Sequence, residues 1–480
     1  MESILSAPFL DDLLQWVVKA NGFLWGTEFL IPLLCGTGLF FSLRLGFVQV
    51  SKFGTACRRL LGNFSLHGKA AGTEGMSSFQ ALATAIAAQV GTGNLVGAMT
   101  ALVSGGPGAI FWMWVAAFFG MATNFAEACL AQLYKEKDET GQVVGGPAYY
   151  ISRGLGGGFF ARALAVFFSV SIILALGFMG NMVQANSISD AFNGAFGWDV
   201  KAVGAALAVV AGLIFIGGVK RIARVTEKLV PIMAIMYVVV GLVLIGMNVQ
   251  HIPSVFAQIF SCAFAPKAVW GGVAGVAIAQ AARYGIARGL FSNEAGMGST
   301  PHAHAVAQVA HPVEQGVLGI IAVFIDTFVV LNITVISVMT SGVLENNFVE
   351  GGPQLKGISL VQAAFSQHFL GEWGNVFVAI CLLFFAFSTV IGWYYFGESN
   401  VRYLFGKAGL MPYRLLVVLF IFVGSALKID LVWELTDFFN GIMVIPNLVA
   451  ILLLSGKVVR LLDEYNKGIA YDKEAVLNGK

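Results

Sequence analysis

Eleven long, mostly apolar segments, separated by short polar stretches, dominate the chain. A helix needs about 20 apolar residues to cross the hydrocarbon core of a bilayer. Backbone polar groups must be satisfied internally at that depth, which restricts spanning segments to helices or closed barrels. The segments are residues 23–43, 78–103, 107–133, 160–189, 201–219, 229–247, 268–298, 316–342, 372–396, 412–428 and 431–456. They predict an all-α polytopic membrane protein with eleven transmembrane helices in a lipid bilayer.

The composition supports this class and excludes others. Of the 480 residues, 58% are hydrophobic and only 11% are charged, and the mean hydropathy is +0.81. Soluble domains carry about 25% charged residues. A net charge of +2 without a long basic cluster indicates no nucleic-acid partner. The five cysteines are scattered and odd in number, so they predict no disulfide or metal framework.

The two ends of the chain differ from its apolar body. Acidic residues, including Asp11 and Asp12, precede the first apolar run, where a signal peptide would be positively charged. Apolar residues within 3–18 recur at near-helical spacing, which predicts an interfacial helix in an N-terminal segment over residues 1–22. Residues 457–480 are expected to form a cytoplasmic tail.

Basic residues predict the orientation of the spans. With the N-terminus placed outside, the outer segments contain only Lys19, Lys201, Lys267, Lys356 and Lys428. Nearly all other lysines and arginines then fall in inner loops or in the tail, and cytoplasmic loops are enriched in these residues. The expected orientation is N-terminus outside and C-terminus inside.

Two of the expected spans are interrupted. The second contains Gln89-Val90-Gly91-Thr92-Gly93-Asn94, and the seventh contains GLFSNEAGMGSTP, residues 289–301. Each glycine in a helix interior costs about 1 kcal/mol relative to alanine. Glycines that merely allow close packing are a common alternative, but they do not explain Asn94 or Glu294 at membrane depth.

The interruptions are five spans apart, which indicates an internal repeat. With residues 23–43 set aside as an extra helix, residues 78–247 and 268–456 each contain five spans and begin with an interrupted one. An odd number of spans gives the two halves opposite orientations. Inverted repeats with discontinuous helices around a site near the midplane are typical of secondary transporters.

Helix interruptions also suit particular ligands. Free N–H groups at a helix N-terminus favour a carboxylate, and free carbonyl groups favour Na⁺ or an ammonium group. An amino-acid zwitterion requires both. Ser388 and Thr389, in the ninth span, could complete an all-oxygen Na⁺ site with carbonyls of the first interruption. Hydrogen bonding of both hydroxyls to their own helix is the alternative.

Other polar residues at membrane depth leave several roles open. Glu127, with Asn124 on the same helical face, and Asp326 are functional candidates by default, and a buried structural role is about equally plausible. Asp326 could serve a second ion or a proton. Arg283 and Arg288 precede the second interruption and could pair with carboxylates such as Glu294 or act as gates.

Metal and dinucleotide sites are disfavoured. His302, His304 and His311 lack the spacing and further ligands of a metal site and are expected in a loop. The Gly-x-Gly of GTGNLVG lacks the strand–turn–helix context of a dinucleotide site.

The interrupted helices and their flanks resemble the alanine or glycine:cation symporter family, the sodium:alanine symporters of bacteria and archaea. The resemblance extends over most of residues 75–400, in the family's order. The matching runs are VGTGNLVGAMTA, GGPGAIFWMWVAAFFGMATNFAEACLA, VGGPAYYI, GNMVQANSIS, RGLFSNEAGMGSTPHAHA and FFAFSTVIGWYYFGE.

This resemblance implies a LeuT-type fold with one extra helix in front, and Na⁺-coupled uptake of small neutral amino acids, chiefly alanine and glycine, by alternating access. It implies Na⁺ as the coupling ion, no organic cofactor, no enzymatic activity, a monomer, and a bacterial or archaeal cytoplasmic membrane. The implied substrate contacts are Thr92, Gly93, Asn94, Gln184, Phe291, Ser292, Glu294 and Trp393. The implied Na⁺ contacts are Gln89, Val90, Gly93, Ser388 and Thr389.

Three alternatives remain at this level. A proton-coupled transporter of the same fold would use Asp326 or Glu294. An intramembrane enzyme would need a nucleophile–base pair or a metal motif, which the sequence does not suggest. Interrupted helices can also line channels, although inverted halves are more typical of transporters.

Overall fold

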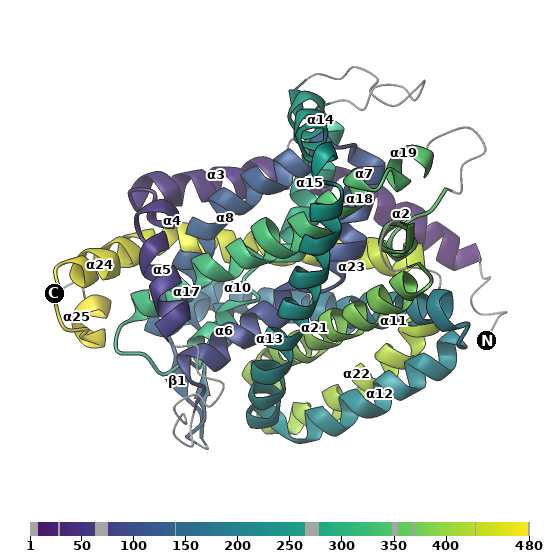
Figure 1. Cartoon of the computed structure of the whole chain (residues 1–480). Helices are drawn as coiled ribbons and strands as arrows, with labels where there is room; N and C mark the ends of the chain where they lie inside the picture. The colour runs from purple at the N-terminus through teal and green to yellow at the C-terminus, as the bar shows by residue number, and fades with distance from the viewer. Residues whose placement is uncertain are drawn as a thin grey trace.

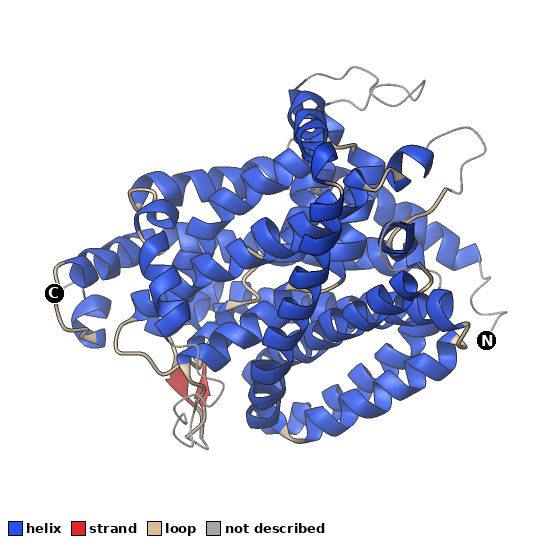
Figure 2. Cartoon of the chain, in the orientation of Figure 1, coloured by secondary structure: helices blue, strands red, loops and turns tan. Residues whose placement is uncertain are grey.

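The computed structural model describes residues 8–26, 29–62, 75–139, 141–264, 278–347, 354–367, 371–427 and 429–478 (Figure 1). Helices make up almost all of this part of the chain, and most of them run alongside one another through its body (Figure 2). The predicted helical class is confirmed. Among the described residues, β1 (Glu136–Lys137) and β2 (Val143–Val144) form a short antiparallel ladder, with Glu136 opposite Val144, and Met76 forms an isolated parallel bridge with Ala307.

The N-terminal helices end and begin at other residues than expected. Helix α2 (Pro8–Leu24) extends beyond residue 22, and α3 (Leu30–Arg44) begins seven residues after the expected start of the first span. The expected boundary was wrong because α2 is held against α23 through tertiary contacts, with Asn21 Nδ2 donating to Glu434 O at 2.8 Å. Two short helices that the sequence did not suggest, α4 (Val48–Ser51) and α5 (Phe53–Gly62), follow.

Residues 78–247 contain the first group of helices. They are α6 (Ser78–Gln89), the π-helix η1 (Gly93–Gly97), α7 (Ala98–Gly105), α8 (Gly108–Leu133), α9 (Pro147–Gly154), α10 (Phe159–Ile172), the π-helix η2 (Ile173–Gly180), α11 (Asn181–Phe196), α12 (Val200–Ile216) and α13 (Gly218–Met247). A 3₁₀ turn, η3 (Val249–His251), and the unexpected α14 (Ile252–Phe264) come next.

The second group starts at residue 278, so part of the expected span 268–298 lies outside the described residues. It comprises α15 (Ile278–Asn293), α16 (Pro301–Ala305), α17 (Pro312–Phe324), the π-helix η4 (Ile325–Leu331), α18 (Asn332–Thr340), α19 (Val343–Asn347), α20 (Ile358–Phe365), α21 (Trp373–Phe405), the 3₁₀ helix η6 (Gly406–Gly409), α22 (Leu410–Ala426) and α23 (Ile429–Leu453). The expected tail is also helical in part, as α24 (Ser455–Asn466) and α25 (Lys473–Asn478).

Several of these helices have the length and apolarity to cross a membrane. Among the described residues six helical segments do so, and a seventh if α6 and η1–α7, bent by 44° at their break, form one span. The segment Trp373–Ala426 among these six contains both α21 and α22. Helices α3 and α12 are apolar but shorter. The finding supports a polytopic membrane protein.

The first four spans of one group each pack against the span of the same position in the other group. The contacting pairs are α7 with α15, α8 with α17, α11 with α21, and α12 with α22. The interrupted first helices therefore meet inside the bundle, with Ser388 and Thr389 of α21 also buried there.

Candidate functional site

The first interruption lies at Val90–Thr92, as the sequence predicts. Helix α6 ends at Gln89, Val90 is extended, and η1 restarts the chain at Gly93. The amide of Gly91 donates to the side-chain oxygen of Asn94 at 3.0 Å. A Cβ on Gly91 would lie 2.3 Å from Thr389 Oγ1. Glycine is therefore required because α21 approaches the open backbone here.

The second interruption covers residues 294–300, a shorter stretch than GLFSNEAGMGSTP suggested. Helix α15 continues through Asn293, so residues 289–293 are still helical. Positive φ angles follow at Glu294 (55°), Gly296 (90°) and Gly298 (79°). This region is natural for glycine but strained for glutamate. Pro301 then occupies the first turn of α16, where its missing N–H costs nothing.

The Glu127 carboxylate satisfies the backbone of this second interruption. Buried in α8, it accepts hydrogen bonds from the amides of Gly296 (3.1 Å) and Gly298 (3.0 Å) and from the side chain of Asn447. An unpaired buried amide would cost about 1–3 kcal/mol. Of the two roles left open for Glu127, the contacts thus favour the structural one.

The two interruptions are joined directly. The Gln89 side chain donates to Asn293 O at 2.6 Å, and a Cβ on Gly93 would lie 2.8 Å from Ser292 Cα. The Asp326 carboxylate in η4 accepts from Asn94 Nδ2 at 2.7 Å and from Ser292 Oγ at 3.0 Å. Asp326 thereby holds one polar side chain from each interruption.

Ser388 and Thr389 contact the end of α6. Thr389 Oγ1 lies 3.0 Å from Ala87 O and 3.3 Å from Val90 O, and Ser388 Oγ lies 3.2 Å from Ala87 O. Both hydroxyls also lie near Phe385 O in their own helix, at 2.8 and 3.1 Å, so the hydrogen bonding to their own helix that was considered as the alternative is present. Two hydroxyl and two carbonyl oxygens are a neutral donor set that suits a hard monovalent cation.

The Ala87 carbonyl was missed by the sequence reasoning. The Val90 carbonyl lies 3.3 Å from Thr389 Oγ1, the side chain of Gln89 donates to Asn293 O, and Gly93 packs against Ser292. Helical geometry could have indicated Ala87. The last four carbonyl groups of a helix receive no hydrogen bond from an amide within the helix, and Ala87 is among the last four residues of α6.

Thr92 and Gln184 present unpaired polar atoms at the first interruption. Gln184 Oε1, from α11, accepts the Thr92 amide at 3.1 Å. Thr92 Oγ1 and Gln184 Nε2 are buried and have no hydrogen-bond partner among the described residues. Buried polar atoms are nearly always paired, so this donor and this hydroxyl are the groups best placed to meet a polar ligand.

Aromatic side chains border the second interruption. The Trp393 indole N–H and the Ser299 hydroxyl both donate to the Glu294 carboxylate. The Phe291 ring lies edge-on to Trp393, with centroids 5.7 Å apart. Trp393 in turn packs closely on Gly180 of η2, where a Cβ would lie 2.5 Å from its ring. Glu294, Phe291 and Trp393 thus form one buried wall.

Three π-helical segments surround this region. They are η1 with Asn94, η2 with Gly180, and η4 with Asp326. Single π-helical turns inside α-helices occur frequently at functional sites.

Arg288 forms an ion pair with Asp437 and not with Glu294. Its guanidinium forms two hydrogen bonds with Asp437 of α23, at 2.8 and 2.6 Å, and lies 5.1 Å from the Trp433 ring centroid. Of the roles left open for Arg288, the structure thus shows pairing with a carboxylate, which is Asp437 rather than Glu294, because Glu294 accepts from Trp393 and Ser299. The Arg283 guanidinium lies 5.8 Å from the Tyr284 ring.

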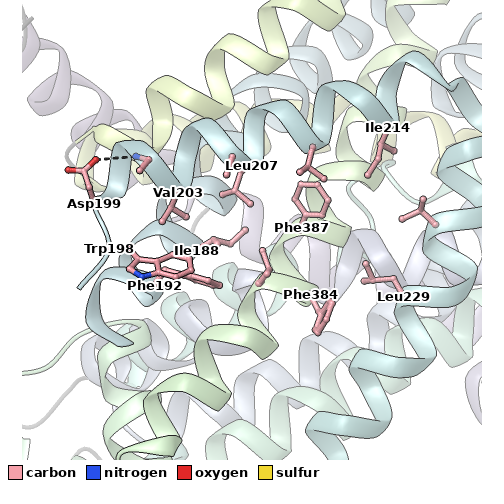
Figure 3. Close-up of a pocket in the computed structure, with 15 residues that line it drawn as sticks. Ile188, Phe192, Trp198, Asp199, Val203, Leu207, Ile214, Leu229, Phe384 and Phe387 are labelled. Atoms are coloured by element: carbon pink, nitrogen blue, oxygen red, sulfur yellow. Dashed lines mark hydrogen bonds between the residues drawn. The ribbon is translucent and has the colours of Figure 1, made fainter. Parts of the chain in front are cut away.

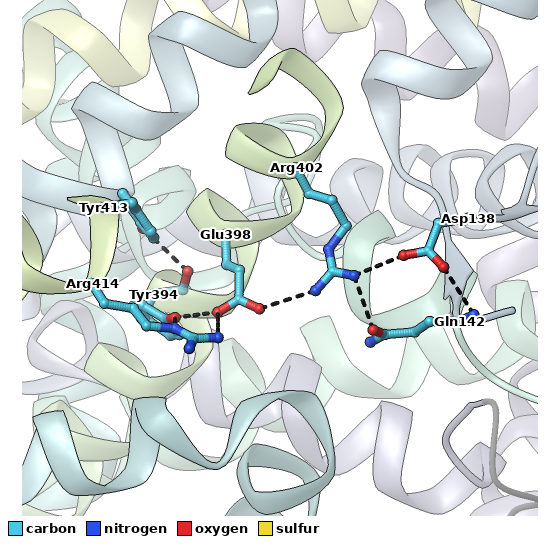
Figure 4. Close-up of polar contacts among 7 residues, drawn as sticks. All are labelled: Asp138, Gln142, Tyr394, Glu398, Arg402, Tyr413 and Arg414. Atoms are coloured by element: carbon cyan, nitrogen blue, oxygen red, sulfur yellow. Dashed lines mark hydrogen bonds and ion pairs between the residues drawn. The ribbon is translucent and has the colours of Figure 1, made fainter. Parts of the chain in front are cut away.

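A second polar network, which sequence reasoning missed, joins α21 and α22 to the β-ladder loop (Figure 4). Arg402 Nη1 donates to Asp138 at 2.8 Å and to Gln142 at 3.0 Å, and Glu398 lies within 3.4 Å of both Arg402 and Arg414. The i, i+4 spacing of Glu398 and Arg402 was the available signal. The network ties the loop after α8 to α21.

The histidines have structural partners. His302 and His304 lie in α16, not in a loop as expected, because Pro301 restarts the helix. His302 Nδ1 lies 2.7 Å from Ser299 O, and His304 Nδ1 lies 2.9 Å from Gln315 Oε1. His311 caps α17 by accepting the Val313 amide at 3.2 Å.

The profile of the sodium:alanine symporter family matches residues 10–478. The chain belongs to this family. It is 43% identical to the sodium/alanine symporter AgcS of Methanococcus maripaludis, over 95% of the chain and 98% of that protein. It is 41% identical to the probable sodium/glutamine symporter GlnT of Bacillus subtilis, over 97% of the chain and 94% of that protein.

Family membership confirms the class expected from the resemblance. The chain is a transporter rather than an enzyme, and the family's class of activity is Na⁺-coupled symport of amino acids. The crystal structure of MhsT in complex with L-phenylalanine is similar, with a TM-score of 0.60 and 13% identity over 85% of this chain and 96% of that one. This likeness confirms the predicted LeuT-type fold.

Proposed function

We propose that the chain takes up small neutral amino acids, such as alanine and glycine, together with Na⁺ by alternating access. The observation that carries the proposal is the meeting of the two interrupted helices beside Thr92, Gln184, Ser388 and Thr389. Unpaired buried polar atoms and a neutral oxygen cluster both adjoin Gly91, where a Cβ would lie 2.3 Å from Thr389 Oγ1 and 3.1 Å from Gln184 Oε1. The relative AgcS, named as a sodium/alanine symporter, supports the choice of substrate and ion.

The amino acid would bind between the two interruptions. Thr92, Gly93, Asn94 and Gln184 would contact it from the first side, and Phe291, Ser292, Glu294 and Trp393 from the second. Thr92 Oγ1 and Gln184 Nε2 are free to meet its polar groups. The Glu294 carboxylate would accept its ammonium group, after exchange of a bond with Trp393 or Ser299. The edge-on contact of Phe291 with Trp393, with ring centroids 5.7 Å apart, would restrict the site to a small side chain.

Na⁺ would be held by Ser388, Thr389 and the carbonyls of Val90 and Ala87, with Gln89 and Gly93 flanking the site. Coupling follows from this arrangement, because the same open backbone at Val90–Thr92 faces the ion on one side and the substrate on the other. Binding of either ligand would therefore order the segment for the other.

The remaining architecture is proposed on the same basis. Each of the eleven expected spans contains a described helix, and the packing of the first four spans of one group on their counterparts in the other supports two inverted five-helix repeats over residues 78–247 and 268–456. The proposed orientation is N-terminus outside and C-terminus inside. A monomer without an organic cofactor, in a bacterial or archaeal cytoplasmic membrane, is proposed from the resemblance and from the organisms of the relatives.

Proton coupling is the second candidate, and Asp326 is the observation that favours it. Its buried carboxylate accepts from Asn94 and Ser292, one residue from each interruption. A proton or a second cation at Asp326 would bear on both interruptions at once.

Proteoliposome uptake of labelled alanine separates these candidates. The proposal expects uptake to follow an inward Na⁺ gradient and to persist when a protonophore removes the proton gradient. The Asp326→Asn variant is the matched test, because it keeps the shape of the side chain but cannot exchange a proton. Uptake that ignores Na⁺ but follows a proton gradient, and that Asp326→Asn abolishes, would establish proton coupling instead.

A further inference from the structure

A groove of about 740 Å³ opens between α11, α12, α13 and α21, away from the candidate site (Figure 3). Its described lining is aliphatic and aromatic apart from Asp199 at one end. The Asp199 carboxylate is already used there, since it caps α12 by accepting the amides of Lys201 (2.9 Å) and Ala202 (3.0 Å). The groove therefore offers hydrocarbon contacts and does not suit an amino-acid zwitterion.

The groove exists because α12 packs chiefly on α22, leaving space beside α13 and α21. Small residues on its lining face, Ala202 and Ala206, leave this space unfilled, and the exposed Val210 side chain borders it. From Asp199 to Ile214 the groove follows α12 for about 22 Å, at 1.5 Å per residue. That length is most of the roughly 30 Å hydrocarbon core of a bilayer.

One end of the groove meets a cluster of basic side chains. Arg221, Val225 and Leu229 of α13 share one helical face by their i, i+4 spacing, and Val225 and Leu229 line the groove. Arg224 and Lys228 immediately precede those two residues. Arg221, Arg224 and Lys228 are all exposed.

The acidic residue nearest in sequence does not neutralise this cluster. Glu227 accepts a hydrogen bond from Gln80 of α6 at 3.0 Å, and among the described residues no ion pair joins it to the three basic side chains. The cluster also lies where α12 ends at Ile216 and α13 begins at Gly218, so its charges are placed at the end of an apolar helix pair. Basic residues at such a boundary attract anionic headgroups.

We propose that this groove binds an anionic phospholipid, with an acyl chain along α12 and its phosphate at Arg221, Arg224 and Lys228. The apolar lining selects the hydrocarbon chain, and the unneutralised basic end selects a net negative headgroup over a zwitterionic one. The lipid would fill the space that separates the α12–α22 pair from α13 and α21.

Native mass spectrometry of the purified full chain tests the proposal, with phosphatidylglycerol or phosphatidylcholine added at equal concentration. The wild type is expected to retain phosphatidylglycerol at least fivefold more than phosphatidylcholine. Arg224→Gln with Lys228→Gln should remove this preference. Arg162→Gln with Lys407→Gln, which removes two exposed basic residues of α10 and η6 rather than of α13, should leave it intact.

A groove-filling variant provides the second arm. Ala206→Trp should lower retention of both lipids, because the indole occupies the path of the acyl chain. Equal retention of the two lipids by the wild type would overturn the proposal, as would retention unaffected by Ala206→Trp. A dimer that dissociates in Ala206→Trp without a change in lipid retention would assign the face to a second copy of the chain.

Discussion

The two interruptions open the helix backbone in different ways. At Val90–Thr92 the break is short and its polar groups are met by side chains from α11 and α21, with some atoms left unpaired. At Glu294–Thr300 the break is longer, has three positive φ angles, and its amides are fixed by a buried carboxylate on α8. The comparison teaches that the first break leaves polar atoms unpaired, whereas two amides of the second break are held by a carboxylate on a neighbouring helix.

This difference predicts that Glu127→Ala has the largest effect on stability. Two buried amides, of Gly296 and Gly298, would lose their acceptor at about 1–3 kcal/mol each. We expect thermal unfolding in detergent to shift down by several degrees, or folding to fail. Glu127→Gln keeps an acceptor oxygen and should be much milder. Equal melting temperatures for wild type and Glu127→Ala would show that the second break needs no brace.

At the first break, Gly91→Ala should damage ion binding more than folding. The new Cβ would meet Thr389 Oγ1 at 2.3 Å and push α21 away from Val90. We expect the Na⁺ concentration for half-maximal uptake to rise by more than tenfold. Gly97→Ala in the same segment is the matched control, because the nearest atom to its Cβ is 3.8 Å away. Equal Na⁺ dependence of the two variants would remove Gly91 from the ion site.

Asn94→Ala should weaken alanine binding by roughly tenfold, with the protein still folded. The change removes the acceptor for Gly91 N and the donor to Asp326, together about 1–2 kcal/mol of positioning. A calorimetric titration with alanine measures the loss. Unchanged affinity would mean that the first break is only structural.

Thr389→Ala should raise the Na⁺ requirement by a smaller factor, about five- to tenfold, since it removes one neutral oxygen ligand. Ser388→Ala should act less, because Ser388 Oγ contacts Ala87 O but not Val90 O among its described hydrogen bonds. Uptake curves against Na⁺ concentration test the order. An effect of Ser388→Ala larger than that of Thr389→Ala would place the ion elsewhere along α21.

The smallest effect is expected outside both breaks, at Lys135 beyond the end of α8, where its ammonium donates to Ala307 O at 2.9 Å. Burial, and then the nearby Lys473, lower the pKa of Lys135 to about 8 from its usual 10.5. Between these values the unfolded chain binds more protons, so folding stability should rise with pH from about 8 to 10.5.

The Lys135→Gln variant should lack this rise while binding alanine and Na⁺ as the wild type does. Melting temperatures across that pH range test the first part, and titrations test the second. A changed Na⁺ dependence in Lys135→Gln would show that residues outside the two breaks also determine ion binding.

The sequence predicted the position of the first break because glycines, Thr92 and Asn94 are visible within six residues. It could not predict that Glu127 braces the second break, because the pair is separated by 169 residues and joined only by packing. Similarly, α2 ends at Leu24 through contacts with α23, which local periodicity does not reveal. Local sequence patterns thus predicted where helices and breaks lie, whereas the tertiary contacts that join distant segments could not be predicted from them.

The most direct test of the account is calorimetric titration of the purified chain with alanine, in NaCl and in KCl at equal ionic strength. If one open break serves both ligands, alanine binds at least tenfold more tightly in NaCl, and Thr389→Ala removes most of this difference. Equal alanine affinity in the two salts would contradict the account.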